Sequence, residues 1–181
     1  LKYPKLLENR PHAHCMNFAP SCSHQNDSES SDRMTTTTIS FHSVAFTNAA
    51  QANVPSHYDN TTLVDIPCDQ LTPPLVDILG GHVTFFSLDV EGAENQVLRT
   101  VDFSKVHVDI WMVESVNQFC QRGERCESRD ESRAILQRAG YVGFENIVYG
   151  SDIFVLPSSE HYKRLSNRFD PAHQIKDIKL G

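Results

Sequence analysis

The feature that most constrains the fold is an apolar run that passes, through a short acidic turn, into a helix-like repeat. Residues 83–88 are nearly all apolar and β-favouring, which is typical of a strand covered on both faces. After the turn DVEG at residues 89–92, Ala93, Val97 and Val101 recur every four residues. That spacing predicts a helix with one buried stripe. A buried strand followed at once by a helix is typical of an α/β sheet, so we predict this fold class.

The other hydrophobic patterns extend this order along the chain. We predict strands at 39–46, 63–67 and 106–113, helices at 74–79 and 128–139, and an antiparallel pair of strands at 141–148 and 151–156. The end of a helix at 5–10 and a short strand at 12–19 precede them, and the Ser/Thr-rich residues 21–38 predict a flexible loop. The expected sheet is mostly parallel, with a C-terminal antiparallel hairpin at its edge.

Size and charge narrow the class of protein. The 181 residues suit a single domain, which we place at residues 1–157, followed by a polar tail at 158–181. We expect the last ten residues of this tail to have little to pack. The net charge of −7 and the scattered basic residues argue against nucleic-acid binding. No apolar run approaches the ~20 residues that span a bilayer. No leader sequence opens the chain. Because residue 1 is Leu rather than Met, the sequence does not decide whether a leader or anchor lies upstream.

The cysteines leave the compartment open between the cytoplasm and the secretory pathway. The five cysteines contain no CxxC pair, and we interpret them mainly as buried or incidental thiols. Cys120 and Cys126 flank a polar loop and would form a disulfide in an oxidising compartment. The glycosylation triplets at Asn26 and Asn60 are compatible with the same compartment. The nine histidines show no metal-ligand spacing.

Acidic residues end both predicted central strands. Asp89 and Glu91 follow the first strand and Glu114 ends the second. Ligands of open α/β sheets bind beyond the carboxyl ends of the strands, so we expect these carboxylates to converge there, with Glu94 one turn into the helix. We interpret Asp89 as functional, because an acid that closes so apolar a strand needs a specific partner. Glu94 is interpreted first as a helix-terminal charge.

These residues resemble a known family. The sequence FSLDVEGAE at residues 86–94 looks like the central motif of the FkbM methyltransferase family. Flanking pieces agree in order and spacing at residues 9–11, 17–19, 66–71, 97–98, 101–103, 114 and 140–141. The resemblance covers roughly residues 5–157, and its nine-residue core is the most specific part.

The resemblance implies a class I, Rossmann-like methyltransferase that transfers a methyl group from S-adenosylmethionine, usually to an oxygen of a small molecule or sugar. Asp89 would then lie near the methyl-transfer centre and the cofactor, as a base, an orienter of the acceptor hydroxyl or a metal ligand. Glu91 and Glu114 would support it, and Asn17 and Ala19 would lie near the adenine ring. No metal is assigned from the sequence. Mg²⁺ would suit Asp89 with Glu91 or Glu114 only if their oxygens converge.

The chain also departs from the family pattern. The family carries a glycine-rich turn after its first strand and an acid after its second, and neither occurs in these 181 residues. We therefore expect a sheet that lacks the first two strands, as in an N-terminally truncated member, and weak or no binding of S-adenosylmethionine by this chain alone. Two functions stay open: a methyltransferase, or a non-catalytic FkbM-like module for protein interaction or trafficking.

Overall fold

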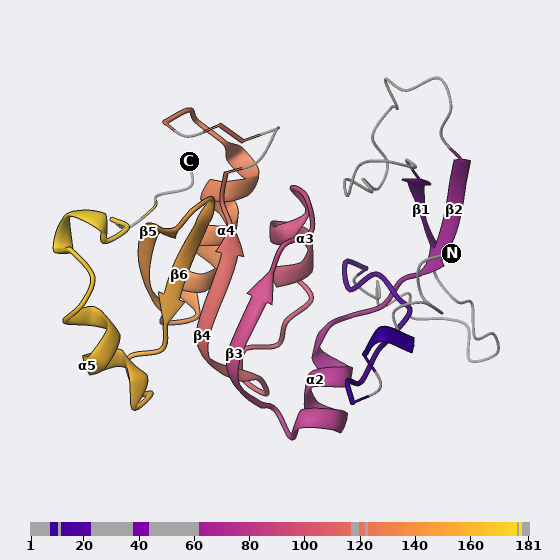
Figure 1. The fold of residues 1–181 in the computed structure, drawn as a ribbon, viewed down its shortest axis with the longest axis horizontal. Coiled ribbons are helices and arrows are strands. Elements are labelled where there is room, and N and C mark those ends of the chain that lie inside the picture. The colour runs from indigo at the N-terminus through magenta and orange to yellow at the C-terminus, as the bar shows by residue number, and fades with distance from the viewer. Residues whose placement is uncertain are drawn as a thin grey trace, which may run out of the picture.

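The computed structural model describes residues 8–10, 12–22, 38–43, 62–116, 120–121, 123–176 and 178. Among them it forms a four-stranded sheet and a separate two-stranded sheet. Figure 1 shows the smaller sheet apart from the larger one, beyond α3, and α2 precedes the first strand of the larger sheet. The predicted loop at residues 21–38 lies mostly outside the described residues. The predicted class, a mixture of helices and sheets, is confirmed.

The four-stranded sheet has the order β3-β4-β6-β5. Its strands are β3 (His82–Leu88), β4 (His107–Glu114), β5 (Val142–Val148) and β6 (Ser151–Val155). β3 and β4 are parallel, whereas β6 pairs antiparallel with both β4 and β5. The predicted hairpin is confirmed. A mostly parallel sheet is not, because two of the three described pairings are antiparallel.

The two-stranded sheet pairs β1 (Thr38–Ser43) with β2 (Thr62–Pro67) in antiparallel fashion. The predicted strands at 39–46 and 63–67 are confirmed as far as they are described, since residues 44–46 lie outside the described residues. The predicted strand at 12–19 is wrong. These residues have no partner strand along their length, and pairing is limited to a single bridge between Ala19 and Cys68.

The helical segments with full bounds among the described residues are α2 (Thr72–Leu79), α3 (Glu94–Leu98), α4 (Glu127–Arg138), α5 (His161–Ser166) and the 3₁₀ turn η1 (Pro171–His173), and residues 8–9 are helical as well. The predicted helices at 74–79 and 128–139 are confirmed. Gly80 ends α2 with a φ of +67°, a conformation that glycine adopts without strain. α3 is shorter than its four-residue repeat predicts, because the chain turns at Arg99 and Thr100 before it reaches Val101. None of the described helices is long and apolar enough to cross a membrane.

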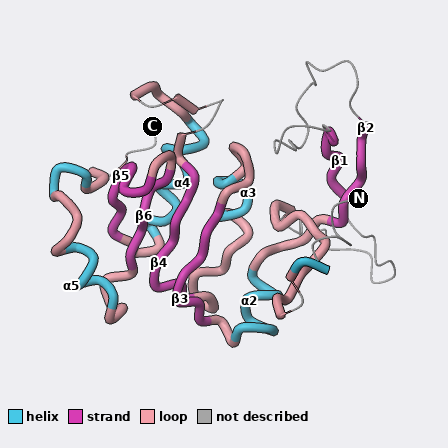
Figure 2. The backbone as a smooth tube through the Cα atoms, viewed as in Figure 1, coloured by secondary structure: helices cyan, strands magenta, loops and turns pink. Residues whose placement is uncertain are grey.

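The main core lies between one face of the larger sheet and the helices α3 and α4. Trp111 of β4, Leu98 of α3 and Leu136 of α4 are fully buried there, and Figure 2 shows both helices beside the strands. Removing such side chains from water provides most of the stability of a domain, at about 25 cal/mol for each Å² of apolar surface.

The strand β3 is more exposed than the sequence predicts. Phe85 on β3 is 51% exposed, so the prediction that this strand is covered on both faces is wrong. β3 lies at the edge of the sheet, and no described element covers its second face.

The expectation that the last ten residues have little to pack is also wrong. Ile175 is buried in the main core, and its backbone N–H donates to the carbonyl of Gly143 at 2.9 Å. A side chain at Gly143 would collide with Ile175 and Phe154, so the glycine makes room for this contact.

Candidate active site at the carboxyl ends of β3 and β4

The carboxyl ends of two parallel strands bring acidic side chains together. Asp89 directly follows β3, and Glu114 is the last residue of β4. Because Leu88 pairs with Val113, both strands end at the same edge of the sheet. Carboxylate oxygens of Asp89, Glu94 and Glu114 all lie within 4.8 Å of one another. We call these three residues the acid cluster. The predicted convergence is confirmed for Asp89 and Glu114, whereas Glu91 is not a member of the cluster.

Glu94 has a larger role than the helix-terminal charge expected of it. Its side chain is 4% exposed, and Oε1 accepts hydrogen bonds from the backbone N–H groups of Val90 at 2.9 Å and Gly92 at 3.2 Å. The turn between them contains positive φ angles of +57° at Glu91 and +97° at Gly92. A positive φ is uncommon for a residue other than glycine. Glu94 therefore holds the turn that presents Asp89, and an acid two residues after a turn glycine is the sequence signal for this role.

Burial shifts the ionisation of Glu94. Desolvation raises the pKa of its carboxyl group, because the charged form loses its water, and the nearby negative charge of Asp89 adds to the rise. The hydrogen bonds from Val90 and Gly92 stabilise the charged form and oppose the shift without cancelling it. Glu94 therefore holds a proton to higher pH than an ordinary glutamate.

Three acidic groups this close favour either a shared proton or a bound cation, because like charges at short range repel. Oxygen ligands are those that Mg²⁺ and Ca²⁺ prefer. The condition set for Mg²⁺, that the oxygens converge, is met by Asp89 and Glu114 together with Glu94. The burial of the members is graded: Asp89 is exposed, Glu114 is half-buried and Glu94 is buried. The most accessible group is thus the one that sequence reasoning singled out.

Asn17 and Ala19 are the residues expected near the adenine ring, which stays a prediction. Asn17 is exposed, and Ala19 is 6% exposed in a small cluster with Ile39 and Cys68. The backbone of Ala19 is also engaged, since its N–H donates to Pro67 at 2.8 Å and its carbonyl accepts from Asp69 at 3.0 Å. The sequence contains no glycine-rich strand-to-helix turn. The described residues therefore do not include the glycine-rich turn with which the family holds S-adenosylmethionine.

The described residues contain two disulfides. Cys120 and Cys126 are bonded, as the loop between them predicts, and Cys22 is bonded to Cys68. For Cys22 and Cys68, the interpretation as buried or incidental thiols is therefore wrong. Cys22 and Cys68 are 46 residues apart, and no local spacing signals a pairing over such a distance. Their segment approaches the turn after α3, where the hydroxyl of Thr100 donates to the carbonyl of Pro20 at 3.2 Å.

Comparison with known proteins agrees with this geometry. The family model for the Methyltransferase FkbM domain matches residues 4–142, about three quarters of the chain and all of the acid cluster. The strand-turn-helix and its acids thus belong to a methyltransferase-type domain. The chain is a member of the FkbM methyltransferase family. No curated protein and no solved structure matches it.

Proposed function

We propose that this chain supplies the residues that bind the methyl acceptor in an S-adenosylmethionine-dependent methyltransferase. The acceptor atom is an oxygen of a small molecule or sugar. The observation that carries the proposal is the acid cluster at the carboxyl ends of the parallel strands β3 and β4, in a chain of the FkbM family. Ligands of α/β sheets bind at this edge.

The three members of the acid cluster have different roles in this proposal. Asp89 is exposed and would orient the acceptor hydroxyl through a hydrogen bond and take up the proton that this hydroxyl loses when it is methylated. Glu114 supports Asp89 from the end of β4. Glu94 holds the turn through Val90 and Gly92. The methyl group itself comes from the cofactor.

We propose further that the four-stranded sheet is the C-terminal part of a Rossmann-like class I sheet. Its parallel β3–β4 pair followed by an antiparallel hairpin supports this assignment. β3 is at the edge of the described sheet, where a further strand could pair with its backbone. The two disulfides favour an oxidising compartment, so we propose the secretory pathway over the cytoplasm.

The test is methyl transfer by the full-length protein and its Asp89→Asn variant, measured as labelled methyl groups moved from S-adenosylmethionine to a panel of hydroxylated acceptors. Asparagine keeps the shape of Asp89 but cannot take up a proton, so we expect a loss of about 10²-fold or more at an unchanged melting temperature. The matched control is Asp77→Asn, which changes an exposed aspartate on α2 and should retain full activity.

The second candidate is a non-catalytic FkbM-like module for protein interaction or trafficking. The absence of a glycine-rich turn from these residues favours it. It predicts no methyl transfer by either form of the full-length protein, and partner binding that Asp89→Asn leaves unchanged. Activity of the wild-type protein that depends on Asp89 would eliminate it.

A further inference from the structure

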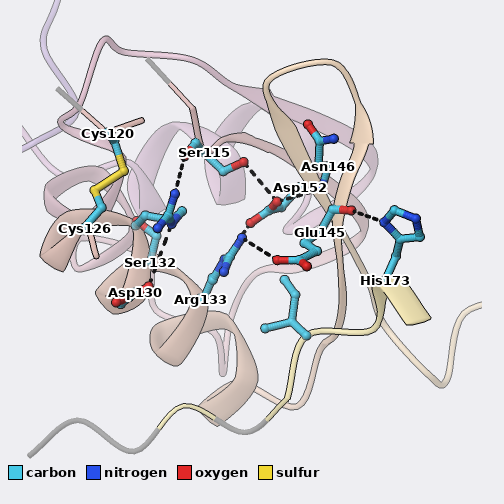
Figure 3. Close-up of polar contacts among 12 residues, drawn as sticks. Ser115, Cys120, Cys126, Asp130, Ser132, Arg133, Glu145, Asn146, Asp152 and His173 are labelled. Carbon is cyan, nitrogen blue, oxygen red and sulfur yellow. Dashed lines mark hydrogen bonds and ion pairs between the residues drawn. A yellow bond between two sulfur atoms is a disulfide. The ribbon is translucent and has the colours of Figure 1, made fainter. Parts of the chain in front are cut away.

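A second polar cavity opens at the same edge of the sheet, between α4 and the β5–β6 hairpin. Its volume is about 300 Å³. Figure 3 shows Arg133 of α4 facing Asp152 and Glu145 of the hairpin, with Ser115 on one side and His173 on the other. Small-molecule pockets begin at about this volume, so the cavity has room for a molecule no larger than a monosaccharide.

The cavity lies on the face of the sheet opposite to Glu114. Val113 pairs directly with Asp152, and directly paired residues project to the same face, whereas adjacent residues along a strand alternate. Asp152 therefore projects to the face that α4 covers, and Glu114 to the other. The cavity is separate from the acid cluster, although Ser115 follows Glu114 in the chain.

One wall of the cavity is rigid and fully bonded. Asp152 is 1% exposed, and its carboxylate accepts from Arg133 Nε at 2.7 Å, from Ser115 Oγ at 2.9 Å and from the Asn146 N–H at 3.0 Å. These bonds join α4, the residue after β4 and the stretch of β5 between Phe144 and Val148, where the register with β6 shifts. On another side, the disulfide between Cys120 and Cys126 fixes the loop that brings Glu124 to the lining. A ligand thus meets a preorganised surface.

Other groups in the lining keep hydrogen-bonding capacity. Arg129 has a side chain that is 10% exposed. Its Nε makes no hydrogen bond among the described residues, although it lies 3.8 Å from a carboxylate oxygen of Asp130. A buried donor without an acceptor is costly. Glu145 is half-exposed and offers a carboxylate, and Asn146 offers an amide that both donates and accepts. Asn146 also has a φ of +51°. Such backbone conformations occur preferentially at functional sites.

The charges of the lining indicate the class of ligand. Two arginines face three carboxylates, those of Glu124, Glu145 and Asp152. The lining is thus net negative by one with a neutral His173, which disfavours phosphates and other polyanions. Interspersed donors and acceptors around a small cavity suit a molecule whose hydroxyl groups both donate and accept. We propose that this cavity binds a neutral polyhydroxylated molecule of monosaccharide size, independently of methyl transfer.

The experiment is an NMR titration of the ¹⁵N-labelled 181-residue chain with D-glucose, D-galactose, D-mannose and, separately, inorganic phosphate. The main variant is Asn146→Gly. It removes the amide from the lining, and glycine adopts the positive φ without strain, so the melting temperature should not fall. Glu145→Gln is the second variant, and Tyr149→Ser, at a 99% exposed position of the same hairpin, is the matched control.

We expect saturable shifts at Ser115, Glu145 and His173 with at least one hexose. Asn146→Gly should weaken that affinity by about 3- to 10-fold, the loss expected for one or two hydrogen bonds, and Glu145→Gln by less. Tyr149→Ser should bind as the wild type does. The proposal is overturned if no hexose gives saturable shifts, if the shifts lie away from the cavity, if both variants bind as the wild type does, or if phosphate binds more tightly than every hexose.

Discussion

Two regions of the molecule are stabilised in different ways. The N-terminal unit comprises residues 12–22, 38–43 and 62–70, and the main sheet unit comprises the described residues from 71 onward. Apolar burial dominates the main sheet unit, whose principal core contains fourteen buried residues. The N-terminal unit has a cluster of three buried residues, Ala19, Ile39 and Cys68. Strand pairing and the Cys22–Cys68 disulfide complete it.

The difference bears on function because the expected site residues are divided between the units. Asp89, Glu114 and Glu94 belong to the main sheet unit, whose core positions both strand ends. Asn17 and Ala19, expected beside the cofactor, belong to the N-terminal unit. A small core buries too little surface to offset the entropy of ordering its chain. A covalent link therefore matters more in the N-terminal unit than in the main sheet unit.

The largest expected effect comes from the core of the main sheet unit. Trp111 is fully buried, with its ring centroid 4.6 Å from that of Phe86. Trp111→Ala should lower the free energy of unfolding by about 3–5 kcal/mol, because it leaves a large cavity. Urea unfolding measures this change. Phe85→Ala, which shortens a half-exposed aromatic on β3, is the matched control and should cost less than about 1 kcal/mol. Equal losses in the two variants would contradict the burial of Trp111 in the main core.

The second effect separates the two units. Cys22→Ser with Cys68→Ser should destabilise the N-terminal unit by about 2–4 kcal/mol, because the disulfide closes a long loop of the unfolded chain. Amide hydrogen exchange should then quicken in β1 and β2 while β3, β4 and β6 keep their protection. The control is Cys120→Ser with Cys126→Ser, which opens a loop of six-residue separation and should cost about 2 kcal/mol. Loss of protection throughout the main sheet in the first variant would show that the two units are not independent.

A smaller effect concerns the turn that presents Asp89. Glu94→Ala removes the acceptor of the Val90 and Gly92 N–H groups and should cost about 2 kcal/mol. Glu94→Gln keeps an acceptor oxygen and should cost less. Urea unfolding of both variants at neutral pH measures the difference. Similar losses would mean that these hydrogen bonds contribute little.

The smallest effect is the pH dependence that Glu94 contributes. Its pKa is raised on folding by burial, so the folded chain binds more protons than the unfolded chain between the ordinary value of 4.5 and the raised pKa. Stability from this group is therefore complete below the ordinary value and falls as pH rises through the raised one. Glu94→Gln removes this fall. Urea midpoints of the wild type and the variant should diverge as pH rises through that window, and parallel curves would contradict the raised pKa.

Local sequence patterns predict most of the main sheet unit and little of the N-terminal unit. The run at residues 83–88 and the acids at Asp89 and Glu114 identify β3, β4 and the site edge, because periodicity and strand-end position depend on nearby residues. The Cys22–Cys68 bond and the bridge at Ala19 depend on contacts over more than forty residues, which no local pattern encodes. Asp152 is likewise not marked by a local pattern, because its partner Arg133 lies 19 residues away on a different element.

The central claim is that this chain carries the residues that bind the methyl acceptor but lacks the glycine-rich turn that holds the cofactor. Calorimetric titration of the 181-residue chain with S-adenosylmethionine tests it most directly. The account predicts no saturable binding in the micromolar range, because the chain has no glycine-rich turn and the backbone of Ala19 is already hydrogen-bonded. A micromolar dissociation constant would contradict it and would place a complete cofactor site within these residues.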